Sequence, residues 1–173
     1  MSVPPGPDPS PLGRYAPDPS GARLARVVLL GLPVPLLLAG QEHHDGLMRE
    51  FGLLALAGQI AETDAPRRLV ELVAILGQQY GSARERRDEE IDAALLRGDV
   101  TIDQVMGVPE TATAPVRALQ ELMAEADEYC RQAMLVTLPR PDAVRRFSDW
   151  YLAEMTGQIA GAPPHRWDGP LRL

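Results

Sequence analysis

Several residue types that carry specific chemistry are scarce or missing in this chain. Of its 173 residues only one is cysteine, three are histidine and 5% are aromatic, and lysine is absent. The single cysteine, Cys130, cannot form a disulfide within the chain, and its place on an apolar helical stripe predicts a buried, inert thiol in a reducing compartment. With so few aromatic residues, the core must be built mainly from Leu, Val, Ile, Met and Ala, a mixture that favours packed helices.

Positive charge is also in short supply. The chain has 24 acidic residues against 17 arginines, which gives a formal net charge of −7. The longest arginine runs are pairs such as Arg67-Arg68 and Arg145-Arg146. Nucleic-acid binding needs clustered positive charge to neutralise phosphates. The sequence therefore predicts no nucleic-acid partner.

No apolar run is long enough for a membrane helix. The longest run, residues 27–39, falls short of the about 20 apolar residues that a bilayer requires. Gly31, Pro33 and Pro35 interrupt it, and Gln41 stands where a lipoprotein signal would place its cysteine. We therefore expect a cytoplasmic protein without a membrane anchor.

Motifs for nucleotide binding and hydrolysis are missing as well, since the chain contains no GxxxxGK[ST], GxGxxG or GxSxG sequence. The most suggestive polar cluster is residues 42–45, with His43 and His44 side by side. Adjacent helical residues diverge by about 100°, so the two histidines cannot both face one metal ion. His44 falls on the apolar stripe and His43 at its edge. The sequence predicts no catalytic residue, no metal site and no cofactor.

The pattern of apolar residues predicts an all-α fold, a four-helix bundle over residues 23–162. Helices are expected at about 35–62, 65–97, 115–134 and 142–160, each opened or closed by proline or glycine. Residues 1–22 contain seven prolines and predict a disordered tail, and residues 163–173 predict a short irregular tail.

Two segments outside these helices are ambiguous. Residues 26–32 could form a strand or an extended lead-in to the first helix. We expect the lead-in, because no second strand-like run is available to pair with it. Residues 98–113 are expected to be a long connection with a turn of helix around residues 102–106.

The first helix is apolar on more than one side. Its core stripe includes Leu47 and Phe51, and a second apolar set lies on nearly the opposite face: Leu38, Leu53, Leu56 and Ile60. This second set predicts either a central position in the fold or an oligomer interface, most simply that of a homodimer.

Five residues are candidates for contacts with a protein partner: His43, Glu50, Arg146, Trp150 and Trp167. Arg146 precedes Trp150 by four residues, so the two side chains can pair on a helix surface, and Arg and Trp are frequent anchors of interfaces. The alternative for Trp167 is that its tail packs across its own bundle.

Two stretches carry a family resemblance. They are residues 31–34 (GLPV) followed by 43–51 (HHDGLMREF), and residues 125–130 (EADEYC) followed by 147–152 (FSDWYL). Together they resemble helical actinobacterial regulatory proteins of partner-switching systems, in which an anti-sigma factor kinase, a phosphorylatable antagonist and a phosphatase control a sigma factor. The resemblance covers most of residues 31–167. It implies a cytoplasmic helical module whose partner is an anti-sigma factor or an antagonist, and it transfers no active site.

The leading hypothesis is therefore a non-enzymatic regulatory or protein-interaction module. Two alternatives stay open. One is a helical-bundle metalloenzyme resembling the DinB-like thiol transferases. The other is a bundle that binds a small apolar ligand between its helices, where Gly40, Gly58 and Gly77 would make room.

Overall fold

The computed structural model describes residues 23–57 and 65–173, and the side chains of residues 55, 65, 66 and 75–86 fall outside this description. In chain order the elements are β1 (Leu24–Pro33), α1 (Val34–Leu56), α2 (Ala65–Arg97), β2 (Thr101–Pro109), the short 3-10 helix η2 (Glu110–Ala112), α3 (Thr113–Arg131) and α4 (Asp142–Ile159). The structure does not describe three parts of the chain for which the sequence made predictions. They are the tail 1–22, the residues Gly58 and Ile60, and the start of the second helix before residue 65.

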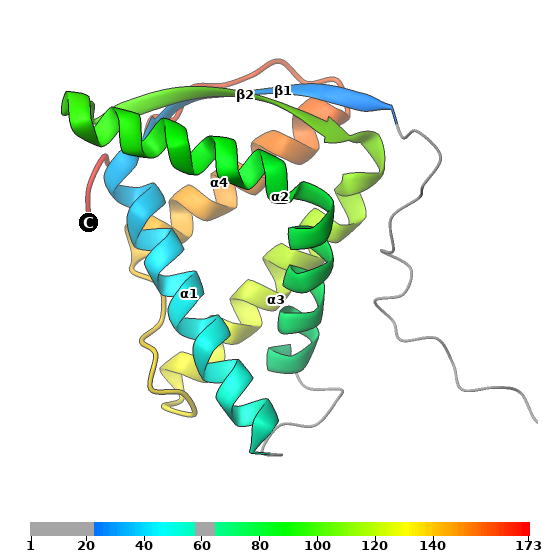
Figure 1. Cartoon of the computed structure of the whole chain (residues 1–173), viewed down its shortest axis with the longest axis vertical. Coiled ribbons are helices and arrows are strands. Elements are labelled where there is room, and N and C mark those ends of the chain that lie inside the picture. Colours follow the sequence, from blue (N-terminus) through cyan, green and yellow to red (C-terminus); the bar gives the residue numbers. More distant parts are fainter. Residues whose placement is uncertain (1–22, 58–64) are drawn as a thin grey trace, which may run out of the picture.

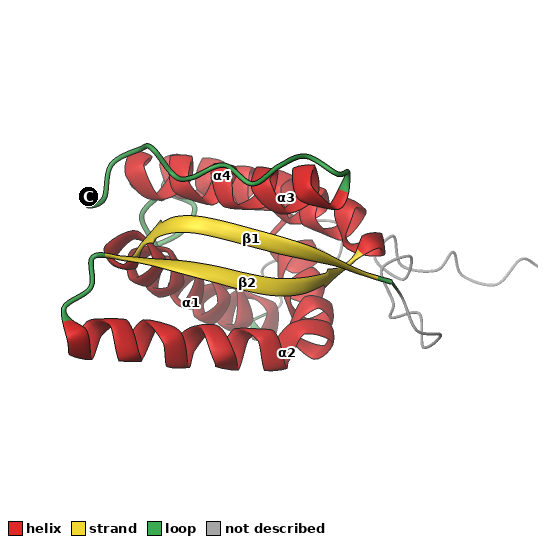
Figure 2. Cartoon of the chain, turned by 90° about the horizontal axis from the view of Figure 1, so that it is seen from above, coloured by secondary structure: helices red, strands yellow, loops and turns green. Residues whose placement is uncertain are grey.

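The expected all-α four-helix bundle is wrong, because the helices carry a two-stranded antiparallel sheet. β1 and β2 pair from Leu24 opposite Pro109 to Pro33 opposite Thr101. The strands form a ribbon across one end of the helices (Figure 1). Viewed from above, α2 runs alongside β2 and α4 runs alongside β1 (Figure 2).

Both ambiguous segments belong to this sheet. Residues 26–32 lie within β1 instead of forming a lead-in, and residues 101–109 form β2 where a connection with a turn of helix was expected. In β2, the buried Gln104 and Val108 alternate with exposed residues such as Asp103 and Val105. This half-polar alternation suits a strand with one buried face, but it gives a weak hydrophobic signal.

A bulge in β1 directs the chain from the sheet into α1. The register shifts between Leu29 and Leu32, where β1 carries one extra residue. Gly31 adopts a φ of +71°, a Cβ there would lie 2.8 Å from Nη1 of Arg166, and its N–H donates to Oδ1 of Asp103 at 2.6 Å. Glycine adopts this positive φ without strain, and its lack of a Cβ leaves room for the Arg166 side chain.

The edge of β1 that does not pair with β2 is covered by the Gln158 side chain and by the C-terminal tail. The Gln158 amide donates to the carbonyl of Val28 and accepts from its N–H, both at 2.8 Å. Further along, the N–H of Trp167 donates to the carbonyl of Leu30 at 3.0 Å. These bonds occupy backbone groups that would otherwise leave an open strand edge.

The core has two main parts. Under the sheet, apolar residues of β1, α1 and α4 pack together, including Leu29, Leu36 and Phe147. Toward the other end, α1, α2 and α3 pack through Phe51, Leu72 and other residues. The few aromatic rings are concentrated in the first part, where Phe147 contacts the rings of Trp150, Tyr151 and Trp167.

Candidate functional site

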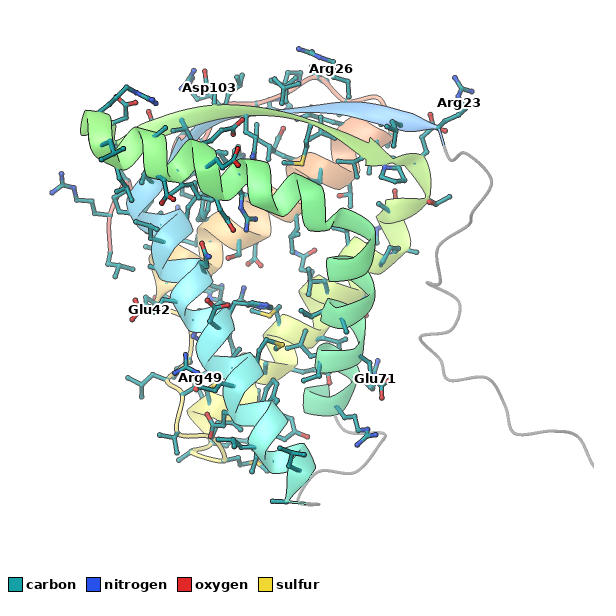
Figure 3. All side chains as sticks on the ribbon, in the orientation of Figure 1. Arg23, Arg26, Glu42, Arg49, Glu71 and Asp103 are labelled. Carbon is teal, nitrogen blue, oxygen red and sulfur yellow. The ribbon has the colours of Figure 1, made fainter. Side chains whose placement is uncertain are left out.

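A cavity of about 370 Å³ lies between the helices and the underside of the sheet. α1, α2, α3 and α4 surround this region in the view of Figure 1, and the cavity is partly open to solvent. The labelled charged residues Glu42, Arg49 and Glu71 lie on the outside (Figure 3). Most of the lining is aliphatic, and residues from each of the four helices contribute: Leu36, Ile91, Val116, Leu119, Met123 and Leu152.

A few polar side chains also line the cavity: Gln41, His44, Arg87, Arg140, Ser148 and Tyr151. The hydroxyl of Ser148 donates to the carbonyl of Val144 at 2.8 Å, within the turn of α4 that precedes it. Arg140 is paired with the buried carboxylate of Asp127. Arg87 and Tyr151, from α2 and α4, supply the charged and the phenolic hydrogen-bond donors of this lining, and Gln41 adds an amide.

Arg87 reaches the cavity from α2 and meets Tyr151 of α4. The two side chains lie close to each other in the cavity lining. Burial raises the pKa of Tyr151, and the nearby Arg87 charge opposes this effect. Nη2 of Arg87 has a long contact of 3.5 Å with Oδ1 of Asp88, and its Nε is buried without a partner among the described residues.

Arg87 is a site residue that the sequence reasoning missed. The charged run 84–90 has opposite charges three and four residues apart, a pattern that by itself predicts a solvated helical surface. Arg87 nevertheless precedes the buried Ile91 and Ala94 by four and seven residues, which places it on their side of α2. This helical spacing could have identified Arg87 as a residue that faces the interior.

Next to the cavity, a buried charge cluster connects α1, α3 and the start of α4. Arg140 donates to Asp127 from its backbone N–H at 3.1 Å and from Nε at 2.9 Å, and its Nη2 lies 2.8 Å from Oδ2. Nε2 of His43 lies 3.9 Å from Oδ1 of Asp127, and all three side chains are at most 8% exposed. Burial lowers the pKa of His43, Asp127 opposes the shift, and Arg140 adds to it. The cluster therefore consists of a neutral histidine beside an ion pair.

The second predicted contact residue on α1, Glu50, holds the connection between α3 and α4. Its carboxylate accepts the backbone N–H of Val136 at 2.6 Å and of Thr137 at 2.9 Å. Burial acts to raise the pKa of Glu50, but these hydrogen bonds outweigh it and the pKa is lowered. Glu50 is thus half-buried and ionised at neutral pH.

The remaining predicted contact residues lie on α4 and in the tail. Arg146 is exposed, and Trp150 is half-buried, with its ring 6.0 Å from that of Phe147 between centroids. Trp167 is only 8% exposed, and its ring packs against Phe147 and Trp150 at 5.5 and 5.3 Å. The partner roles of these residues, and of His43 and Glu50, stay predictions.

Cys130 is buried, as the sequence predicted, and forms no disulfide. Burial, Asp127 and Glu50 raise its pKa to about 11. Such a thiol is protonated at neutral pH and is a poor nucleophile.

Within residues 23–57 and 65–173, no three His, Cys, Asp or Glu side chains are grouped in a way that could hold a metal ion. No helix in the same ranges is long and apolar enough to cross a membrane. Comparison with known proteins gives no match to a family model, a curated protein or a solved structure.

Proposed function

We propose that this protein binds a small, mainly apolar molecule in the cavity between its helices. The observation that carries the proposal is the cavity itself. Its volume of about 370 Å³ lies in the usual range for ligand pockets, and an aliphatic lining with a few polar groups is typical of them. At ~30 Å³ for each water-sized group, it has room for about a dozen non-hydrogen atoms.

Packing energetics support this proposal. Water in a partly open apolar pocket gains few hydrogen bonds from an aliphatic lining, so covering that lining with an apolar ligand is favourable through the hydrophobic effect. Leu36 of α1, Ile91 of α2, Leu119 of α3 and Leu152 of α4 all face the same space. A ligand there would restore contacts to four helices at once, and it would couple their positions.

Neutral apolar compounds such as 1-octanol, 1-decanol and naphthalene should therefore raise the melting temperature. A ligand that binds only the folded state stabilises it by about 2.7 kcal/mol at a concentration of 100 Kd. Leu119→Trp fills the cavity and should abolish the shift, while Leu95→Trp, at a position on α2 that is 48% exposed, should preserve it. Differential scanning fluorimetry and calorimetry measure both effects. No shift with any compound, or equal shifts in the two variants, would contradict the proposal.

A second candidate function is the regulatory interaction module that the resemblance implies, acting as a homodimer through α1. Leu53 and Leu56 are 64% and 88% exposed near the end of α1, and Leu38 is 37% exposed. Large apolar side chains exposed along one helix favour an interface. In a partner-switching pathway, such a module would contact an anti-sigma factor or an antagonist. Ile60, the fourth residue of the predicted interface, lies outside the described residues.

If α1 forms a dimer interface, Leu56→Asp should convert a dimer into a monomer with little change in the stability of the fold. The reason is that Leu56 makes few contacts within its own chain, whereas a carboxylate in an apolar interface is costly to desolvate. Size-exclusion chromatography with light scattering gives the mass. Leu96→Asp, at a residue of α2 that is 90% exposed, is the matched control. A wild-type monomer at high micromolar concentration would refute the dimer.

A further inference from the structure

We infer that the ligand is a medium-chain monocarboxylate whose headgroup binds Arg87 and Tyr151 while its alkyl chain fills the aliphatic part of the cavity. The inference rests on the proposed function and specifies the class of ligand. Its evidence is that the two arginines that line the cavity differ in their partners. Arg140 is paired with a buried carboxylate, whereas Arg87 has a buried Nε without an acceptor in the described part of the chain.

The charge of Arg140 is already neutralised, because the buried Asp127 carboxylate lies 2.8 Å from its Nη2 and accepts from its Nε at 2.9 Å. Arg87 differs. Its contact with Asp88 is 3.5 Å long, its side chain is 26% exposed, and its buried Nε has no acceptor in the described part of the chain. A guanidinium has five N–H donors, and a partly buried one with few acceptors is stabilised by an anion.

Tyr151 of α4 adds a second donor next to Arg87. Arginine has no hydrogen-bond acceptor, so toward the nearby Arg87 the Tyr151 oxygen can only act as an acceptor. The phenol proton then remains available to a ligand. Burial keeps the pKa of Tyr151 above its ordinary value, so this proton is retained at neutral pH. A carboxylate has two oxygens, one for the guanidinium and one for the phenol.

The rest of the site limits the ligand to a single negative charge. One arginine with one phenol matches a monoanion, and the net charge of −7 disfavours polyanions such as nucleotides. The aliphatic side chains of Leu36, Leu119 and Leu152 suit an alkyl chain. Two carboxylate oxygens leave room for about ten carbons, given the ~30 Å³ that each group occupies.

Isothermal titration calorimetry with decanoate, 1-decanol and decylamine tests the inference, because the three differ mainly in their headgroup. Wild-type protein should bind decanoate roughly tenfold or more tightly than 1-decanol, which is the ratio that a hydrogen bond to a charged group implies, and decylamine most weakly. Arg87→Met should remove the preference for decanoate and change the affinity for 1-decanol less than about threefold. Arg97→Met, at an exposed arginine of the same helix, should change neither.

Each outcome separates the inference from the function on which it rests. If 1-decanol and decanoate bind wild-type protein equally well, the headgroup site is refuted and the apolar pocket stands. If neither 1-decanol nor decanoate binds, the headgroup site and the proposed apolar pocket are both refuted. If Arg87→Met weakens the two ligands to the same extent, Arg87 only supports the fold and the inference fails. If Arg87→Met no longer unfolds cooperatively, the test uses the ratio of decanoate to 1-decanol affinity in wild-type protein and in Tyr151→Phe. The inference then requires a preference for decanoate in the wild type and a smaller preference in Tyr151→Phe.

Discussion

Replacing Asp127 with alanine should lower the free energy of unfolding by about 3–5 kcal/mol, the cost of leaving a buried charge without its partner. The Asp127 and Arg140 side chains are each 4% exposed, and the carboxylate is the acceptor for three donors of Arg140. Removal of the carboxylate leaves the guanidinium charged and buried beside an apolar cavity. Urea denaturation followed by circular dichroism measures the loss.

Two further variants show whether the effect comes from burial of the charge. The double variant Asp127→Ala, Arg140→Met removes both charges and should recover much of the stability, because apolar residues often replace buried ion pairs without loss. Asp142→Ala breaks an exposed pair with Arg145, in which the Asp142 side chain is 89% exposed, and should cost less than about 1 kcal/mol. If Asp127→Ala costs no more than Asp142→Ala, the Asp127–Arg140 cluster does not stabilise this fold.

Trp167→Ala should destabilise the protein by about 3–5 kcal/mol, the range for loss of a large buried aromatic side chain. The Trp167 ring is 8% exposed, packs against Phe147 and Trp150, and donates from Nε1 to the carbonyl of Pro170 at 3.0 Å. Its backbone N–H also holds the tail against β1. Thermal and chemical denaturation measure the loss, and near-ultraviolet circular dichroism reports on the aromatic cluster.

Leu173→Ala, at a residue of the same tail that is 74% exposed, is the matched control and should be nearly neutral. If Trp167→Ala is equally neutral, the tail does not pack on the core. Trp167 would then be available for the partner contact that the sequence predicted.

The sequence predicted the helices well, because each has an apolar stripe and a proline or glycine at its ends. The fourth helix was expected at 142–160 and spans Asp142–Ile159, and the third was expected at 115–134 and spans Thr113–Arg131. The sheet was missed for a physical reason. Its strands pair across the intervening α1 and α2, so no tight hairpin turn marks the pairing.

The candidate site was less predictable than the fold. Gly40 lines the cavity, where the ligand-binding alternative placed it, and so does His44, which the sequence placed on the apolar stripe of the first helix. The cavity itself depends on how side chains of four helices and β2 pack, and one-dimensional spacing does not determine such a volume. Asp127 lies in an acidic run with Glu125 and Glu128, but it follows Met123 by four residues and precedes Cys130 by three, which places it on the apolar side of α3. Its pairing with Arg140 could not be predicted from this spacing.

The most direct test of the central claim is to locate a bound apolar molecule by nuclear Overhauser effects. Methyl-labelled protein saturated with 1-decanol should show contacts between the alkyl protons and the methyl groups of Leu119, Met123 and Leu152, which line the cavity on α3 and α4. Contacts only to exposed residues such as Leu56, Val136 and Leu138, or no contacts at all, would contradict an internal ligand site.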